Sequence, residues 1–384
     1  GENVSDAAMN DATQNTGVGY NALSALTQGD QNVAIGKDAL AANTTGTQNV
    51  AIGVDALTVS TTSSYNVAIG REALKTSDGG VSNVAIGRTA LMLLATGDRN
   101  IAIGHAAMDG TGGATVLDSD DNIFMGYDAG GGTWTTAKCE SNVGIGNYVM
   151  DAAMNGANNN VGVGIHALGG LISGDKNVAL GSYAGYAVTT ASGSTFIGND
   201  AGGTVTTGND NIAIGNDAMY GAATTGNHNI AIGVSAGDAL TSGYSNILIG
   251  KNSGTAINTA AQNVIVGDRS GLQLTDGGYN TILGSGAGGA ATGFSQTVLI
   301  GYGVCADGAL SADKTVGIGY DALKNLTSGA SNTGIGYNAG LYATTADNFV
   351  FIGYQAGQGI TGTKLTGNNN TAVGYNSGLV LQGA

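Results

Sequence analysis

Carboxylates, imidazoles and glycine-rich turns are the residues of this sequence that could bind or transform a ligand. Acidic side chains recur at one fixed spacing, at Asp38, Asp55, Glu72, Asp128, Asp200, Asp217 and Asp321. A catalytic acid and base need different environments to separate their pKa values, and equivalent positions of a repeat offer only one environment. We therefore interpret this column as a solvated acidic strip.

Two other motifs lose their usual meaning for the same reason. Residues 317–322 satisfy the G-x-G-x-x-A fingerprint of dinucleotide binding, but three further segments do so as well, and none opens a βαβ unit. His105, His166 and His228 lie at different repeat positions and far apart, so we expect no shared metal ion or proton relay. The sequence therefore predicts no catalytic residues and no cofactor, and it indicates that the protein is not an enzyme.

A cluster of aspartates is the candidate metal site of the chain. Asp118, Asp120 and Asp121 lie in an insertion near residues 105–121, and clustered carboxylates suit a hard cation such as calcium. The competing interpretation is an ordinary decorated loop.

The only tryptophan lies in a second insertion, near residues 127–141. Insertions in repeat proteins often lie on the binding face. Trp134 could therefore offer its ring to a glycan or receptor, or it could cover a gap between subunits. A third insertion lies near residues 354–369.

An internal repeat must position all these residues. The segment Asn32-Val33-Ala34-Ile35-Gly36 returns with little change along the chain, and its final glycine serves as an anchor. There are 21 anchors from Gly19 to Gly374, of which 14 spacings are 17 residues and three are 18. We therefore expect residues 1–384 to form one continuous array, with repeats over 15–374 and partial coils at 1–14 and 375–384.

Each repeat contains a short strand that ends at the anchor. The residue before the anchor is always Val, Ile, Leu or Met, and the residue three before it is always Val, Ile or Thr. Side chains two apart in a strand share one face, and β-branched residues favour that geometry. We expect these two columns to face the core, and the small residue between them to allow close contact between subunits. Three residues after the anchor, a column of mostly alanine begins a second inward segment.

An asparagine lies four residues before the anchor in 17 of the 21 repeats. Amides at one position of stacked coils can hydrogen bond to their copies above and below, as in other repetitive β structures. The sequence therefore predicts a structural ladder that includes Asn32, Asn49, Asn66, Asn83, Asn100, Asn211, Asn229, Asn246 and Asn263.

A period of 17 residues suits one coil of a parallel β-solenoid, since helical repeats need about 33 residues or more. The composition agrees, because proline is absent and proline cannot donate to a strand ladder. We therefore predict an all-β solenoid of about 21 coils. Each coil is expected to bury only about four residues, so oligomerisation would have to supply further stability. Cys139 and Cys305 lie about ten coils apart, too far for a disulfide within one chain, although like cysteines of different subunits could meet.

Charge and hydropathy exclude other classes of protein. The net charge is −15, which disfavours nucleic acid as a partner, and no apolar run reaches the length of a membrane span. We expect no membrane insertion in this segment.

The N-V-A-I-G-x-x-A-L units resemble the head repeats of trimeric autotransporter adhesins, and they are similar to 17-residue units of phage tail-fibre proteins, especially from marine phages. The resemblance implies left-handed β-rolls packed as a homotrimeric fibre. It also implies an extracellular location, on a virion appendage or, alternatively, on a bacterial cell surface. Because neither end looks like a cap, we expect the chain to be a window of a longer fibre.

Five consecutive repeats carry a tyrosine directly after the anchor. These residues are Tyr302, Tyr320, Tyr337, Tyr354 and Tyr375. In a solenoid they would stack as a ladder that stabilises the coil or fills a subunit interface. The alternative is a strip that binds sugars.

The sequence favours a structural function. The leading hypothesis is a fibre shaft, of a phage tail fibre or similar appendage, that acts as a rigid spacer in attachment to a host surface. The alternative is an adhesin head that binds host matrix or glycans, so a host receptor or glycan is a possible partner besides the chain itself. A third hypothesis, an ice-binding solenoid, needs a regular threonine array, which this chain lacks.

Overall fold

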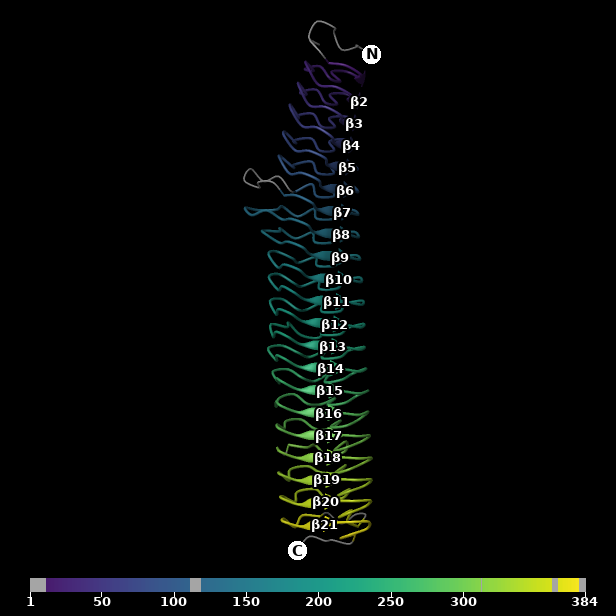
Figure 1. The fold of residues 1–384 in the computed structure, drawn as a ribbon, viewed down its shortest axis with the longest axis vertical. Helices are drawn as coiled ribbons and strands as arrows, with labels where there is room; N and C mark the ends of the chain where they lie inside the picture. Colours follow the sequence, from purple (N-terminus) through teal and green to yellow (C-terminus); the bar gives the residue numbers. More distant parts are fainter. Residues whose placement is uncertain (1–11, 111–118, 312, 361–364, 380–384) are drawn as a thin grey trace. The chain divides into compact units, whose positions relative to one another are not determined.

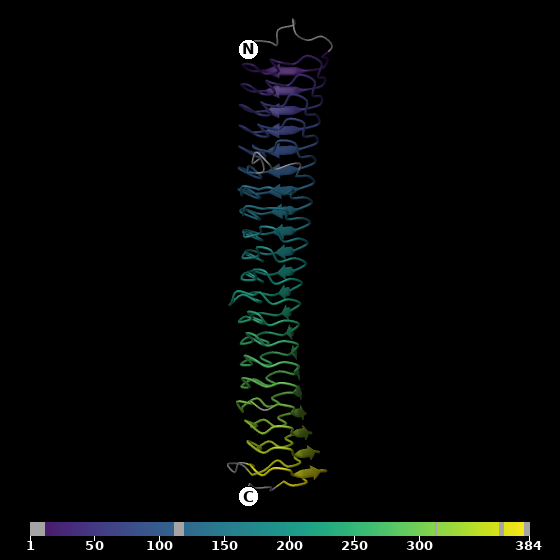
Figure 2. The same cartoon turned by 90° about the vertical axis from the view of Figure 1, so that its left-hand side faces the viewer.

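The protein is an all-β parallel solenoid whose coils repeat about every 17 residues. The structure, a computed structural model, describes residues 12–110, 119–311, 313–360 and 365–379. The chain comprises two compact units, residues 1–193 and 194–384. In each unit the coils are stacked one on another (Figure 1), and each coil contributes one short strand to a row of parallel strands (Figure 2). Among the described residues, no helix is long and apolar enough to cross a membrane.

Every strand has three residues and ends at an anchor glycine, as the sequence predicts. The first unit contains β1 (Thr16–Val18), β2 (Val33–Ile35), β3 (Val50–Ile52), β4 (Val67–Ile69), β5 (Val84–Ile86), β6 (Ile101–Ile103), β7 (Ile123–Met125), β8 (Val143–Ile145), β9 (Val161–Val163) and β10 (Val178–Leu180). The second unit contains β11 (Thr195–Ile197), β12 (Ile212–Ile214), β13 (Ile230–Ile232), β14 (Ile247–Ile249), β15 (Val264–Val266), β16 (Thr281–Leu283), β17 (Val298–Ile300), β18 (Val316–Ile318), β19 (Thr333–Ile335), β20 (Val350–Ile352) and β21 (Thr371–Val373).

Strands pair in parallel and in register within each unit. In the first unit β3 pairs with β4 so that Val50 lies opposite Val67 and Ile52 lies opposite Ile69. In the second unit β14 pairs with β15 in the same register. Equivalent positions of the repeat are therefore neighbours about 4.8 Å apart, and each column of the sequence becomes a row of like side chains.

The inward face of the strand is the opposite of the expected one. In β4 the middle residue, Ala68, is fully buried, whereas Val67 and Ile69 are only partly buried. The prediction that the two β-branched columns face the core is therefore wrong, and so is the role given to the small middle residue. The middle position must be small because it points into a narrow coil, and the β-branched side chains cover the outside.

The interior of a coil holds more residues than the four expected. In the coil around Gly53 the buried side chains are Asn49, Ala51, Ala56, Leu57, Ser60 and Ser63. The second inward segment, three and four residues after the anchor, is confirmed by the complete burial of Ala56 and Leu57. Most of these side chains are small, so each coil packs tightly with little apolar volume.

Each coil turns at residues in the left-handed backbone region. In the coil around Gly53 these are Gln48, Asp55 and Leu57, with φ of 57°, 59° and 51°. Asp55 belongs to the column of acidic residues. Asn and Asp tolerate this conformation better than most residues, which gives the column a structural reason. Leucine is unusual there, and it is held by the burial of its side chain.

The anchor glycine closes the coil against its neighbour. Gly53 has φ of 139°, a region that residues with a side chain rarely adopt. A Cβ atom built on Gly53 would lie 2.4 Å from the carbonyl oxygen of Gly70 in the next coil. Glycine is therefore required both by the backbone angle and by the close approach of two backbones.

We predict that Gly53→Ala destabilises the protein by more than about 3 kcal/mol, because backbone strain adds to a clash that only a shift of two coils can relieve. The free energy of unfolding in denaturant measures this loss.

Gly79→Ala is the matched control. Gly79 also has a positive φ, of 105°, but a Cβ there meets nothing within 4 Å. Its expected cost is only about 1 kcal/mol of backbone strain. Equal losses in the two variants would contradict the role assigned to the close approach.

Candidate functional site

The outer face of the strands is a continuous apolar surface in each unit. Its side chains come from the first and third residue of every strand, and all of them are Val, Ile, Leu, Met or Thr. Ile35, Ile145 and Leu180 in the first unit are each about 40% exposed, as is Ile197 in the second. Soluble monomers rarely expose contiguous apolar patches of more than a few hundred Å². Here the patch extends along every strand, so this outer face is the main candidate for an interaction surface.

The asparagine column is buried and forms a connected ladder. The backbone N–H of Asn49 donates to Oδ1 of Asn32 over 3.0 Å, and Nδ2 of Asn49 donates to the same oxygen over 3.1 Å. Nδ2 also donates to the carbonyl of Ser63 over 2.8 Å. Oδ1 of Asn49 then accepts the corresponding bonds from Asn66. Each amide thus uses its donors and its acceptor inside the coil.

All nine asparagines named from the sequence take part in this arrangement. In the first unit the backbone bonds link Asn15, Asn32, Asn49, Asn66, Asn83, Asn100, Asn122, Asn142, Asn160 and Asn177. In the second unit they link Asn211, Asn229, Asn246, Asn263 and Asn280. Ser194, Thr297, Thr315 and Phe349 replace asparagine in the second unit only. Phe349 fills the position with a ring stacked on Phe351 at 4.4 Å.

A second side-chain ladder, six residues before the anchor, was not foreseen. Asp98 accepts the backbone N–H of Val81 over 2.8 Å, and Asp120 accepts that of Asp98 over 2.7 Å. In the second unit Asp347 accepts the N–H of Ala330 in the same way. The signal in the sequence was the frequency of Asp, Asn and Ser at this position, which suits side-chain caps of turns.

The candidate cation cluster does not assemble as expected. Asp118 lies outside the described residues, and Asp120 caps a turn. Asp121 forms a bidentate ion pair with Arg99, with oxygen to nitrogen distances of 2.6 and 2.9 Å. This hydrogen bond lowers the pKa of Asp121. The neighbouring guanidinium is the positive charge here, and the described residues contain no group of ligands fit for a metal ion.

Trp134 lies inside its coil, so the expected binding platform is wrong. The ring is fully buried, its Nε1 donates to the carbonyl of Gly130 over 3.1 Å, and it packs edge-on against Phe124 at 5.9 Å. The three additional residues of this insertion make room for a large side chain in an otherwise narrow core. Neither a glycan nor a gap between subunits can meet this ring.

The tyrosine column forms a stacked ladder in the second unit. The ring centroids of Tyr302, Tyr320, Tyr337, Tyr354 and Tyr375 follow one another at 5.1 to 5.3 Å, with neighbouring planes inclined by 8° to 17°. The rings are about half exposed, but the faces of the three inner tyrosines are covered by their neighbours. A sugar could therefore meet the edges and hydroxyl groups of these rings, but not their faces.

A second aromatic ladder in the first unit joins histidines with tyrosines. His105 stacks on Tyr127 at 5.2 Å, and His166 lies between Tyr148 and Tyr183 at 4.9 Å from each. Tyr127 and Tyr148 meet edge to face. The sequence placed these residues in two different columns, and the structure shows that side chains one residue apart can share one row.

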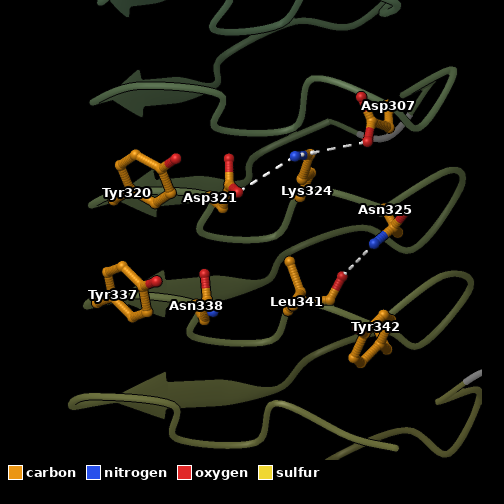
Figure 3. A pocket seen from close by; sticks show the side chains of 9 residues that line it. All are labelled: Asp307, Tyr320, Asp321, Lys324, Asn325, Tyr337, Asn338, Leu341 and Tyr342. Atoms are coloured by element: carbon orange, nitrogen blue, oxygen red, sulfur yellow. Dashed lines mark hydrogen bonds and ion pairs between the residues drawn. The ribbon is translucent and has the colours of Figure 1, made fainter. Parts of the chain in front are cut away.

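A shallow groove runs beside the tyrosine ladder (Figure 3). Lys324 lies in it between Asp321 and Asp307, with nitrogen to oxygen distances of 3.2 and 3.7 Å. Partial burial opposes the charge of Lys324, but the hydrogen bond to Asp321 and the two negative charges outweigh this effect and raise its pKa. The lysine is therefore held in place as a cation.

Both cysteines are free and fully buried. Burial raises the pKa of the Cys139 thiol and of the Cys305 thiol. The suggestion that like cysteines of different subunits could meet is wrong, because each thiol lies inside its own coil.

No family model, curated protein or solved structure matches the chain.

We predict that Asn66→Ala lowers the free energy of unfolding by about 3 kcal/mol or more. The change leaves the buried N–H of Asn83 and the carbonyl of Gly80 without partners, and each such group costs about 1 to 3 kcal/mol. Denaturant unfolding gives the value.

The exposed amide of Gln48, which donates to Gln31 over 2.8 Å, provides the control. We expect Gln48→Ala to cost less than about 0.5 kcal/mol, as surface changes usually do. If Asn66→Ala is as mild as Gln48→Ala, the buried ladder does not stabilise the coil.

We predict that neither thiol reacts with iodoacetamide in the native protein at about pH 8, because burial blocks access and disfavours the thiolate. Both should react once the protein is unfolded in guanidinium. Mass spectrometry counts the modified cysteines, and rapid modification of the native protein would show that the coils open or that the thiols lie outside them.

Proposed function

We propose that this chain is the shaft of a homotrimeric fibre, formed by three left-handed solenoids whose outer strand faces pack together. The fibre serves as a rigid extracellular spacer, of a phage tail fibre or a similar virion appendage, in attachment to a host surface. The observation that carries the proposal is the apolar outer face, which recurs in every strand of both units.

Copies of the chain are the partner that fits this face best. It carries no charged residue in either column, and its side chains repeat at the spacing of parallel strands. A second chain that runs in the same direction would present the same rows at the same spacing, so every coil could pack against an equivalent coil. A closed ring of such contacts would remove the apolar surface from water, and the resemblance of the repeats sets the number of chains at three.

The same architecture supports a mechanical role. Buried amides, caps and aromatic ladders all run from coil to coil, so deformation of one coil disturbs bonds to both neighbours. Repeat proteins of this kind derive their stability from contacts between adjacent units. Stiffness and length would then be the contribution of this segment, and many weak contacts along or beyond it could act together at a surface.

We predict that the purified protein has three times the mass of its 37.5 kDa chain in sedimentation equilibrium. The triple variant Ile52→Glu, Ile86→Glu, Ile249→Glu should sediment as a folded single chain, because burying its carboxylates between subunits costs several kcal/mol each.

The matched control places the same three charges on exposed apolar side chains outside the strands. Val59→Glu, Leu93→Glu and Ile172→Glu replace residues that are 45%, 37% and 41% exposed. This variant should keep the trimeric mass. A wild-type protein that sediments at the mass of one chain would refute the trimer, and dissociation of the control alone would refute the assigned interface.

A further inference from the structure

The groove beside the tyrosine ladder is longer than one binding pocket. It consists of two adjoining depressions in the second unit, of about 420 and 330 Å³. Both are lined by Asp307, Asp321 and Lys324, so they form one groove. It extends from Asp268 to Tyr342 and so crosses five successive coils. A ligand that fills it must be elongated along the direction in which the coils stack.

The walls of the groove present polar groups and ring edges rather than apolar faces. Tyr320 and Tyr337, which are 48% and 43% exposed, form one wall. Their faces are turned to each other at 5.3 Å, so their edges and hydroxyl groups remain for a ligand. Asn325 and Tyr342 lie on the opposite side (Figure 3). A groove with these walls suits a ligand that both donates and accepts hydrogen bonds along its whole length.

The charge of the groove disfavours an anion. Lys324 is neutralised by its contacts with Asp321 and Asp307, which leaves an excess of one negative charge at the centre. At one end Asp268 and Arg269 balance each other. The chain as a whole carries a net charge of −15. Sulfated or sialylated ligands would therefore be repelled, and a neutral ligand would not.

We propose that this groove binds a neutral, linear, hydroxyl-rich oligosaccharide that lies along the stack of coils. An extended chain of β-linked hexoses advances by about one coil spacing for each sugar, so successive sugars can meet equivalent positions of successive coils. The groove provides binding at the flank of the second unit, which a spacer does not require. The inference rests on the side chains of one chain and does not depend on the trimer.

The test is a binding experiment with the full-length protein. Neutral β-linked hexasaccharides of glucose and of N-acetylglucosamine are titrated by calorimetry, and a sulfated hexasaccharide of equal length serves as the anionic comparison. An array of neutral glycans extends the search to other linkages. We expect at least one neutral glycan to bind and the sulfated one not to bind.

The double variant Tyr320→Phe, Tyr337→Phe keeps the stacked rings and removes the hydroxyl groups that line the groove. Loss of two hydrogen bonds predicts an affinity about tenfold lower. Tyr375→Phe, in the same ladder but outside the groove, should leave affinity unchanged, and a thermal melt of each variant shows that it is folded. The proposal is overturned if no neutral glycan binds, if the sulfated one binds better, or if the double variant binds as well as Tyr375→Phe. Sedimentation of the same samples tests the trimer separately.

Discussion

The close approach of neighbouring backbones is the constraint on which the structure depends. Parallel strands bring each anchor glycine against the next, so that the space for a Cβ atom at Gly53 is already taken by the carbonyl of Gly70. The same spacing allows each buried asparagine to bond to the asparagine of the preceding coil. Every other regularity follows, because residues at equivalent positions are forced into rows whether their side chains are apolar, acidic or aromatic.

The narrow coil explains the division of residues between inside and outside. Its interior accepts Ala68 or Ala51 at the middle of a strand, and the two larger β-branched residues of the same strand remain outside. Where a large ring does enter, as Trp134 does, the chain is longer at that coil. A solenoid built in this way leaves an apolar face on the outside, and that face gives the chain a reason to associate with copies of itself.

The sequence predicted the solenoid, the strands, the anchor glycines and the second inward segment, because each repeats in register and depends on local geometry. It misassigned the inner face. Side chains two apart share a face, but the spacing alone does not say which face is buried. The asparagine column contained the answer: Asn49 is two residues from Ala51, so a buried amide requires a buried middle residue.

Among the candidate sites, regular features could be predicted and single residues could not. The tyrosine ladder follows from five equivalent positions. The burial of Trp134 and the pairing of Asp121 with Arg99 depend on the path of an inserted loop, which no column describes. The His105 ladder was missed because its members change column where the spacing changes. The groove at Lys324 depends on side chains from several coils, and no single repeat contains it.

Electron cryomicroscopy of the purified assembly tests the central claim, association through the outer strand face, most directly. We predict three parallel chains around a threefold axis, with the first and third residues of each strand, such as Val67 and Ile69, buried at the contact. A reconstruction in which the outer strand face remains in solvent, or in which the chains meet through the tyrosine ladder, would contradict it.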